Sequence, residues 1–423
     1  GGAGMTAQKP ARPPLLRVER FPGNVEGCRV IEFWPDERRT QVHVIDVPPP
    51  PSSSLEWIVD QIDDREAAGR LAHAKPTPRV INSPTVAGAY GAPLKLFLDL
   101  THRCQIACSF CLSDSGRRRT DEMSPDDAIS ILQEAAHMGV MYAKLGGGEP
   151  TLFPSLPDVL DAGNAAGLAL SMSTNSLWAD ESLVDAMARN RVLVSVSLAG
   201  TRVTNDRFMR RKGHFDAALA KTAELRSSGV QVRFRLTLMP LNLAEVPELV
   251  ELAAAAGVPI KFSYCRPAGR ATRGDHLISP HHRHQYAAVL EYLNRSDLPA
   301  IVELDEGMQA KHPRSLALIQ GLDNACGAGR RSMHIDPSGI ARACVFLGDD
   351  YRVGVWQAGS LAQMWAGTDA PGMTLARSIP TPAPCASCER LCKNECPASR
   401  LHFYGSVAIG QDPNCFRMAL VKE

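Results

Sequence analysis

Three cysteines lie close together at Cys104, Cys108 and Cys111, in the spacing C-x3-C-x2-C. They follow an apolar, strand-like run at 94–100, so we expect them in a loop at the end of that strand. Three thiolates can bind three irons of a [4Fe-4S] cluster and leave the fourth iron open to a cofactor. A zinc ion is the alternative, but structural zinc takes four ligands and no fourth is near. The spacing therefore favours an iron–sulfur cluster with one open iron.

Seven more cysteines lie in the last hundred residues, where the chain is rich in glycine and proline. They are Cys326, Cys344, Cys385, Cys388, Cys392, Cys396 and Cys415. The chain begins without the apolar stretch of a secretion signal, so clustered thiols indicate metal binding rather than disulfides. The segment from about 320 also has too little apolar periodicity to fold on a core of its own, and we expect a metal to hold it together. Seven thiols could form two zinc sites or two iron–sulfur clusters.

The elements that position these cysteines are predicted by hydrophobic periodicity. Six apolar, β-branched runs alternate with helix-period stretches, at 94–100, 140–145, 168–173, 192–198, 230–238 and 258–264. Four glycines follow the helical stretches where a helix C-terminus favours glycine: Gly139, Gly167, Gly229 and Gly257. The alternation predicts an α/β fold, a partial (β/α)6 parallel barrel with its functional loops at the carboxyl ends of the strands.

Composition and charge exclude several classes of protein. The chain has 423 residues and 44% hydrophobic content, too much for a disordered or fibrous chain. Its 46 Lys and Arg balance 45 Asp and Glu, so no overall field draws it to nucleic acid or to an anionic membrane. It has no run of 18 apolar residues, and we expect a cytoplasmic protein. Residues 1–4 resemble the remnant of a removed tag.

Three domains are expected. Residues 1–90 contain strand-like runs at 28–34 and 41–47, a Pro- and Ser-rich tract at 48–54 and a helix from 55 to about 74. This segment is either a substrate-docking module or a strand pair and helix packed on the main domain. Residues 91–300 form the barrel, and residues 301–423 form a small cysteine-rich domain.

The first cysteine motif, with Phe110 directly before its last cysteine, resembles that of the radical SAM superfamily. One strand later, the run Gly146-Gly147-Gly148-Glu149 resembles the GGE motif of that family. The resemblance implies that the open iron binds S-adenosylmethionine and that these glycines and Glu149 contact its amino group. It also implies a carboxylate contact by Ser197 and Arg210 and a ribose contact by Asn175. This chain departs from the family at Ala199, where relatives often have aspartate.

The C-terminal cysteines resemble the SPASM extension of radical SAM enzymes, although the middle gap is three residues where five is usual. The resemblance implies two auxiliary clusters and hence three [4Fe-4S] clusters in total. One set would be Cys326, Cys344 and Cys396, and the other Cys385, Cys388, Cys392 and Cys415. An eighth cysteine is absent, so the first set has an open or non-cysteine position.

The function implied by the resemblance is reductive cleavage of S-adenosylmethionine, followed by hydrogen abstraction from a natural-product precursor. We expect a peptide that is cross-linked or oxidised, with flavodoxin or ferredoxin as electron donor. The alternative is a radical epimerase or dehydrogenase of a sugar-containing small molecule. There Cys265, at the end of the sixth strand, would return a hydrogen atom, although a lone cysteine can also be a buried hydrophobe. A non-catalytic cluster-binding scaffold is the hypothesis from another class.

Overall fold

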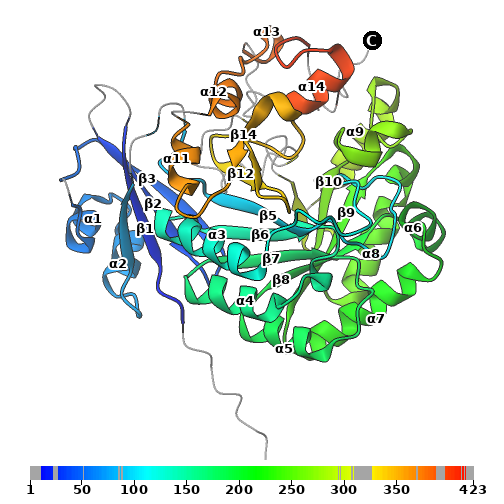
Figure 1. The fold of residues 1–423 in the computed structure, drawn as a ribbon, viewed down its shortest axis with the longest axis horizontal. Coiled ribbons are helices and arrows are strands. Elements are labelled where there is room, and N and C mark those ends of the chain that lie inside the picture. The colour runs from blue at the N-terminus through cyan, green and yellow to red at the C-terminus, as the bar shows by residue number, and fades with distance from the viewer. Residues whose placement is uncertain are drawn as a thin grey trace, which may run out of the picture.

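The computed structural model describes most of the chain in three connected parts: an N-terminal sheet, a barrel and a C-terminal region (Figure 1). The described residues are 11–21, 27–50, 52–83, 86, 89–293, 295, 297–305, 308, 326–367, 370–386, 396–410, 412–413 and 415. Within them, no helix combines the length and the apolar character needed to cross a membrane.

The N-terminal part is a four-stranded sheet with two short helices. Its elements are β1 (Leu15–Arg20), β2 (Cys28–Trp34), β3 (Arg39–Ile45), α1 (Leu55–Gln61), α2 (Arg65–Ala72) and β4 (Arg79–Ser83). The strand order is β3-β2-β1-β4, with β1 antiparallel to β2 and parallel to β4. Apolar side chains from β1, β2 and both helices form a separate small core.

The prediction of one helix from 55 to about 74 was wrong. The side chain of Asp64 accepts hydrogen bonds from the backbone N–H groups of Glu66 and Ala67, which starts a second helix at Arg65. Strand β1 was not predicted, because Arg17 and Glu19 interrupt its apolar pattern. Both side chains are buried as an ion pair, with Nε and Oε1 2.8 Å apart.

The six predicted parallel strands are confirmed. They are β5 (Lys95–Thr101), β6 (Tyr142–Gly147), β7 (Ala169–Thr174), β8 (Leu193–Leu198), β9 (Gln231–Leu238) and β10 (Ile260–Tyr264), each hydrogen-bonded in parallel to the next. The helices that cover their outer face are α3 (Pro125–Met138), α4 (Leu156–Ala165), α5 (Glu181–Arg189), α6 (Arg202–Met209), α7 (His214–Ser227), α8 (Val246–Ala256) and α9 (Arg283–Leu293) (Figure 1).

Local sequence signals set the ends of these helices. Ser124 caps α3 in a reciprocal capping box with Asp127. Gly139 and Gly257 have φ of 91° and 64°, the left-handed conformation that ends α3 and α8. Short 3-10 turns occupy the loops at η1 (Pro150–Leu152), η2 (Pro240–Glu245), η3 (Gly269–Arg273) and η4 (Pro280–His282).

The strands that follow residue 301 extend the same sheet rather than form a second one. Strand β11 (Val302–Leu304) pairs in parallel with β10, and β12 (Ser332–Ile335) pairs in parallel with β5. The antiparallel strands β13 (Ile340–Arg342) and β14 (Arg352–Val355) continue from β12, which makes a ten-stranded sheet. The remaining elements are η6 (Asp349–Tyr351), α11 (Leu361–Ala366), α12 (Pro371–Arg377), α13 (Ala383–Ala386) and α14 (Pro397–Tyr404).

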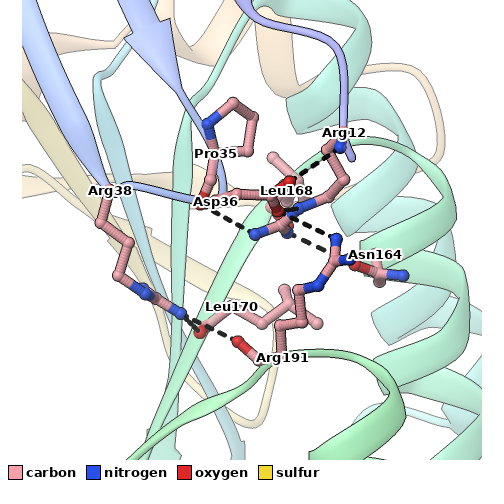
Figure 2. A network of polar contacts seen from close by, with 8 residues as sticks. All are labelled: Arg12, Pro35, Asp36, Arg38, Asn164, Leu168, Leu170 and Arg191. Atoms are coloured by element: carbon pink, nitrogen blue, oxygen red, sulfur yellow. Dashed lines mark hydrogen bonds and ion pairs between the residues drawn. The ribbon is translucent and has the colours of Figure 1, made fainter. Parts of the chain in front are cut away.

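The turn between β2 and β3 docks against the amino-terminal ends of the barrel strands (Figure 2). The guanidinium of Arg38 donates hydrogen bonds to the backbone oxygens of Leu170 and Arg191. Asp36 forms an ion pair with Arg191, 2.9 Å apart, and the hydroxyl of Tyr142 donates to the backbone oxygen of Arg38 at 3.0 Å. The N-terminal sheet therefore covers the end of the barrel opposite the loop that carries the first three cysteines.

Candidate active site

Cys104, Cys108 and Cys111 lie in the loop after β5, as predicted, and all three are partly buried. Burial, together with the neighbouring charges of Cys111 and Cys104, raises the pKa of Cys108 to about 12, so the three thiols lie near one another. In the described part of the chain, no three His, Cys, Asp or Glu side chains are grouped to hold a single metal ion. A [4Fe-4S] cluster binds each thiolate through a different iron, and the donor set of three neighbouring thiols fits such a cluster.

The glycines after β6 bring that strand into contact with the cysteine loop. A Cβ on Gly147 would lie 2.4 Å from the backbone oxygen of Thr101, and one on Gly148 would lie 2.2 Å from that of Arg103. The Gly148 N–H donates to the Thr101 oxygen at 2.6 Å, and the Glu149 N–H donates to the Arg103 oxygen at 2.8 Å. Only glycine permits this approach, which fixes the backbone directly before Cys104.

The Glu149 carboxylate is buried beside the same loop and is 1% exposed. Its Oε1 accepts hydrogen bonds from the hydroxyls of Thr151 and Thr174 at 2.8 and 2.7 Å, and its Oε2 accepts from the Asn175 N–H at 2.7 Å. Burial raises the pKa of Glu149, whereas these hydrogen bonds lower it. Because a carboxylate oxygen can accept two hydrogen bonds, Oε2 retains acceptor capacity for an ammonium group.

Asn175 connects Glu149 to the first cysteine. Its side-chain Nδ2 lies 3.6 Å from the sulfur of Cys104 and 3.2 Å from Oε1 of Gln105. The structure thus places Glu149 and Asn175 together at the carboxyl ends of neighbouring strands, next to Cys104. Their proposed contacts with the cofactor stay predictions.

The loop that carries Arg270 forms hydrogen bonds with the cysteine loop, and it was not identified from the sequence. The backbone N–H of Arg270 donates to the oxygen of Cys111 at 2.9 Å, and its Nε donates to that of Cys108 at 2.8 Å. Its Nη1 donates to Asp114 Oδ1 and to the Ser115 oxygen, at 2.8 and 2.9 Å. Arg270 follows Cys108 by 162 residues, so no local pattern pointed to the contact.

We expect Arg270→Met to lower 5′-deoxyadenosine formation by about tenfold, because three charge-assisted hydrogen bonds to the cysteine loop are lost. The rate and the iron content after anaerobic reconstitution measure this effect. Arg273→Met is the matched control, because that side chain is 70% exposed and its one ion pair with Asp114 is 3.1 Å long. Equal losses in both variants would contradict the role of Arg270.

The remaining predicted cofactor contacts lie around this loop. Phe110 packs edge-on against Phe208 at the end of α6, with ring centroids 6.2 Å apart. Arg210 is exposed and ends α6 with φ of 51°. Ser197 is partly buried on β8 and pairs in register with Arg235 of β9. The end of α6, which carries Arg210, thus reaches the cysteine loop through Phe208, and the cofactor contacts of Ser197 and Arg210 stay predictions.

Cys265 is 4% exposed at the end of β10. It belongs to a small apolar cluster against which Cys104, Cys108 and Phe110 also pack. Burial raises the pKa of its thiol to about 12, so it is protonated at neutral pH. The predicted position, at the carboxyl end of the sixth strand and close to the cysteine loop, is the observed one.

A second group of thiols lies in the C-terminal region. Burial, together with the charges of Cys326 and Cys396, raises the pKa of Cys344 to about 12, so the three thiols lie near one another. The structure therefore brings together the three cysteines predicted to share one auxiliary cluster. Cys385 and Cys415 are partly buried, whereas Cys388 and Cys392 lie outside the described residues.

Arg266 connects the barrel to this second group and was also missed from the sequence. It follows Cys265 directly, and its Nη1 lies 2.7 Å from Oδ2 of Asp305. Its guanidinium carbon lies 5.2 Å from the centre of the Phe346 ring, and its charge lowers the pKa of Cys344. Its only sequence signal was a position next to the predicted donor cysteine.

This chain is similar to one family model, to two named relatives and to one crystal structure. Residues 98–253 match the model of the Radical SAM superfamily. Mycofactocin maturase MftC of Mycobacterium tuberculosis is 29% identical over 349 residues, which cover 80% of this chain and 86% of that protein. PqqA peptide cyclase of Gluconobacter oxydans is 24% identical over 321 residues, which cover 70% of this chain and 83% of that protein. The crystal structure of Streptococcus suis SuiB bound to S-adenosylmethionine has the same fold, with a TM-score of 0.69 and 16% identity. The match covers 96% of this chain and 100% of that chain.

Proposed function

We propose that this chain is a radical SAM enzyme of the SPASM-domain subgroup that modifies a precursor peptide, because residues 98–253 match the Radical SAM superfamily and relatives are named as a maturase and a peptide cyclase. The reaction begins with reductive cleavage of S-adenosylmethionine and abstraction of a hydrogen atom from the peptide. The outcome that we propose is a cross-link or an oxidation. The single observation that carries the proposal is the loop of Cys104, Cys108 and Cys111, which lies at the carboxyl end of the barrel beside Glu149.

The chain's own residues would have defined tasks in this reaction. The three loop cysteines would hold the [4Fe-4S] cluster that the family implies, and Gly147, Gly148 and Arg270 fix the backbone around them. Glu149 would accept a hydrogen bond from the amino group of S-adenosylmethionine, and Asn175 would orient the ribose. Bound together, cluster and cofactor supply a 5′-deoxyadenosyl radical once an electron arrives from a flavodoxin- or ferredoxin-type donor. The barrel excludes water and positions the reacting carbon of the peptide.

We assign Ser197 and Arg210 to the cofactor carboxylate. Arg210 is exposed and directly follows Met209, whose sulfur lies 3.4 Å from that of Cys108. A guanidinium suits a carboxylate because both are planar forks. The left-handed backbone of Arg210 directs the chain away from α6 at this point.

The C-terminal cysteines would hold auxiliary clusters. Cys326, Cys344 and Cys396 are the described set, and we propose that Cys385 and Cys415 form a second set with Cys388 and Cys392. Arg266 lies between the first set and the barrel interior. An electron left on the oxidised peptide could pass to this set, which would make the enzyme an oxidoreductase.

The relatives named as a maturase and a peptide cyclase favour a peptide substrate over the sugar alternative. Cross-linking and oxidation return no hydrogen atom to the substrate, so they need no thiol donor. In the proposed reaction, Cys265 packs the apolar cluster beside the cysteine loop.

An anaerobic assay tests the proposal. The reconstituted protein is expected to form 5′-deoxyadenosine with dithionite and to modify a precursor peptide encoded beside its gene. The double variant C344A/C396A should lose iron and stop converting peptide while 5′-deoxyadenosine is still detected, because the auxiliary set is separate from the first cluster. Absence of 5′-deoxyadenosine from the wild-type protein would instead support a non-catalytic scaffold.

A further inference from the structure

The inner face of the barrel sheet carries several cations, among them Lys144 on β6, Arg235 on β9 and Lys261 on β10. Each is flanked along its strand by two buried apolar residues that belong to the main core under the helices. Successive strand residues point to opposite faces, so these three side chains point into the barrel. An interior of this kind is costly unless the charges are balanced.

The three cations share one face of the sheet. Arg235 and Lys261 are register partners on neighbouring strands. Lys144 lies three strands away, yet the charges of Arg235, Lys95 and Lys261 each lower its pKa, after burial as the largest cause. Register pairing through β7 and β8 places Lys144 on the same face of the sheet as Arg235 and Lys261.

The carboxylates nearby are bonded elsewhere. Glu303 pairs with Arg233. Asp305 pairs with Arg266 at 2.7 Å, and Asp99 pairs with His334 at 2.9 Å.

Burial lowers the pKa of Lys261 to about 8. The negative charge of Asp305 opposes this shift. No hydrogen bond or ion pair reaches Lys144, Arg235 or Lys261 from the residues that the structure describes. The interior therefore carries an excess of positive charge that the described chain does not neutralise.

We propose that Lys144, Arg235 and Lys261 bind a carboxylate of the substrate inside the barrel, either the C-terminus of the peptide or an Asp or Glu side chain. The inference rests on the proposed function, because it takes the substrate to be a peptide. Lys144 precedes Gly147 by three residues on β6, so the carboxylate lies deeper in the barrel than the cysteine loop. A substrate anchored at this depth presents a neighbouring carbon to the cofactor.

Binding to the holoenzyme tests the proposal without turnover. The probe is the acetylated pentapeptide Ala-Glu-Tyr-Glu-Ala, titrated calorimetrically into the reconstituted protein with S-adenosylmethionine and without reductant. We expect it to bind at least about tenfold more tightly than its C-terminal amide with Gln in place of Glu, because charge-assisted hydrogen bonds are lost. The Glu-containing amide and the Gln-containing free acid show which carboxylate is bound.

The variants Lys144→Met and Lys261→Met should each reduce this preference severalfold, whereas Lys75→Met, which removes an exposed cation, should keep it. Equal affinity of the wild-type protein for the acidic and neutral probes overturns the proposal. So does a preference that survives in both interior variants, or a loss of S-adenosylmethionine affinity in them, which would assign the cations to the cofactor. Thermal unfolding confirms that each variant is folded. Formation of 5′-deoxyadenosine by the wild-type protein tests the proposed function separately.

Discussion

Replacement of Cys108 by alanine is expected to abolish 5′-deoxyadenosine formation. Cys108 is the middle thiol of the loop, and the charges of both Cys104 and Cys111 act on it. Two remaining thiolates cannot hold a [4Fe-4S] cluster that needs three protein ligands, so about four irons per chain should be lost. Iron analysis and chromatography of the nucleoside product after anaerobic reduction measure both effects.

Cys28→Ala provides the matched control for this variant. Cys28 is fully buried and lies in the small core of the N-terminal sheet, far along the chain from the loop. Its replacement should cost about 1 kcal/mol of stability and leave the iron content unchanged. If Cys108→Ala retained both its iron and its nucleoside product, the assignment of the loop to the reactive cluster would fail.

The second large effect is expected for Gly148→Ala. The added Cβ would lie 2.2 Å from the backbone oxygen of Arg103, and this neighbour is main chain that cannot rotate away. The strand and the cysteine loop must separate, at a cost of about 1–3 kcal/mol or more. We expect 5′-deoxyadenosine formation to fall at least about tenfold, and the reconstituted cluster to be lost faster on exposure to oxygen.

Gly116→Ala separates this effect from a general intolerance of the region to alanine. Gly116 lies in the same loop and accepts a hydrogen bond from the Cys104 N–H, but a Cβ there meets no atom within 4 Å. Its variant should therefore keep a rate close to that of the wild-type protein. If the Gly148→Ala protein had a normal cluster lifetime, the close approach of β6 to the cysteine loop would not be needed to protect the cluster.

The sequence predicted what local patterns encode. Apolar runs marked the six parallel strands, and Gly139 and Gly257 marked helix ends because only a left-handed residue ends a helix in this way. The cysteine spacing located the loop after β5, because all its residues are neighbours in the chain.

What the sequence did not predict depends on distant contacts. Strands β11 and β12 have three and four residues and join the barrel sheet only through pairing with β10 and β5. Arg270 donates hydrogen bonds to the backbone of the cysteine loop, and the charge of Arg266 lowers the pKa of Cys344; both lie in loops that carry no motif. The positive charge of the barrel interior could not be predicted from the sequence, because Lys144 and Lys261 are isolated cations within apolar strands.

The turn that carries Arg38 also restricts how a long peptide can enter. Arg38 bonds to backbone oxygens at the start of β7 and before β8, and Tyr142 and Asp36 fasten the same turn. These contacts hold the N-terminal sheet against the amino-terminal ends of the barrel strands. We therefore expect the peptide of the proposed reaction to enter and leave from the opposite, carboxyl end of the strands.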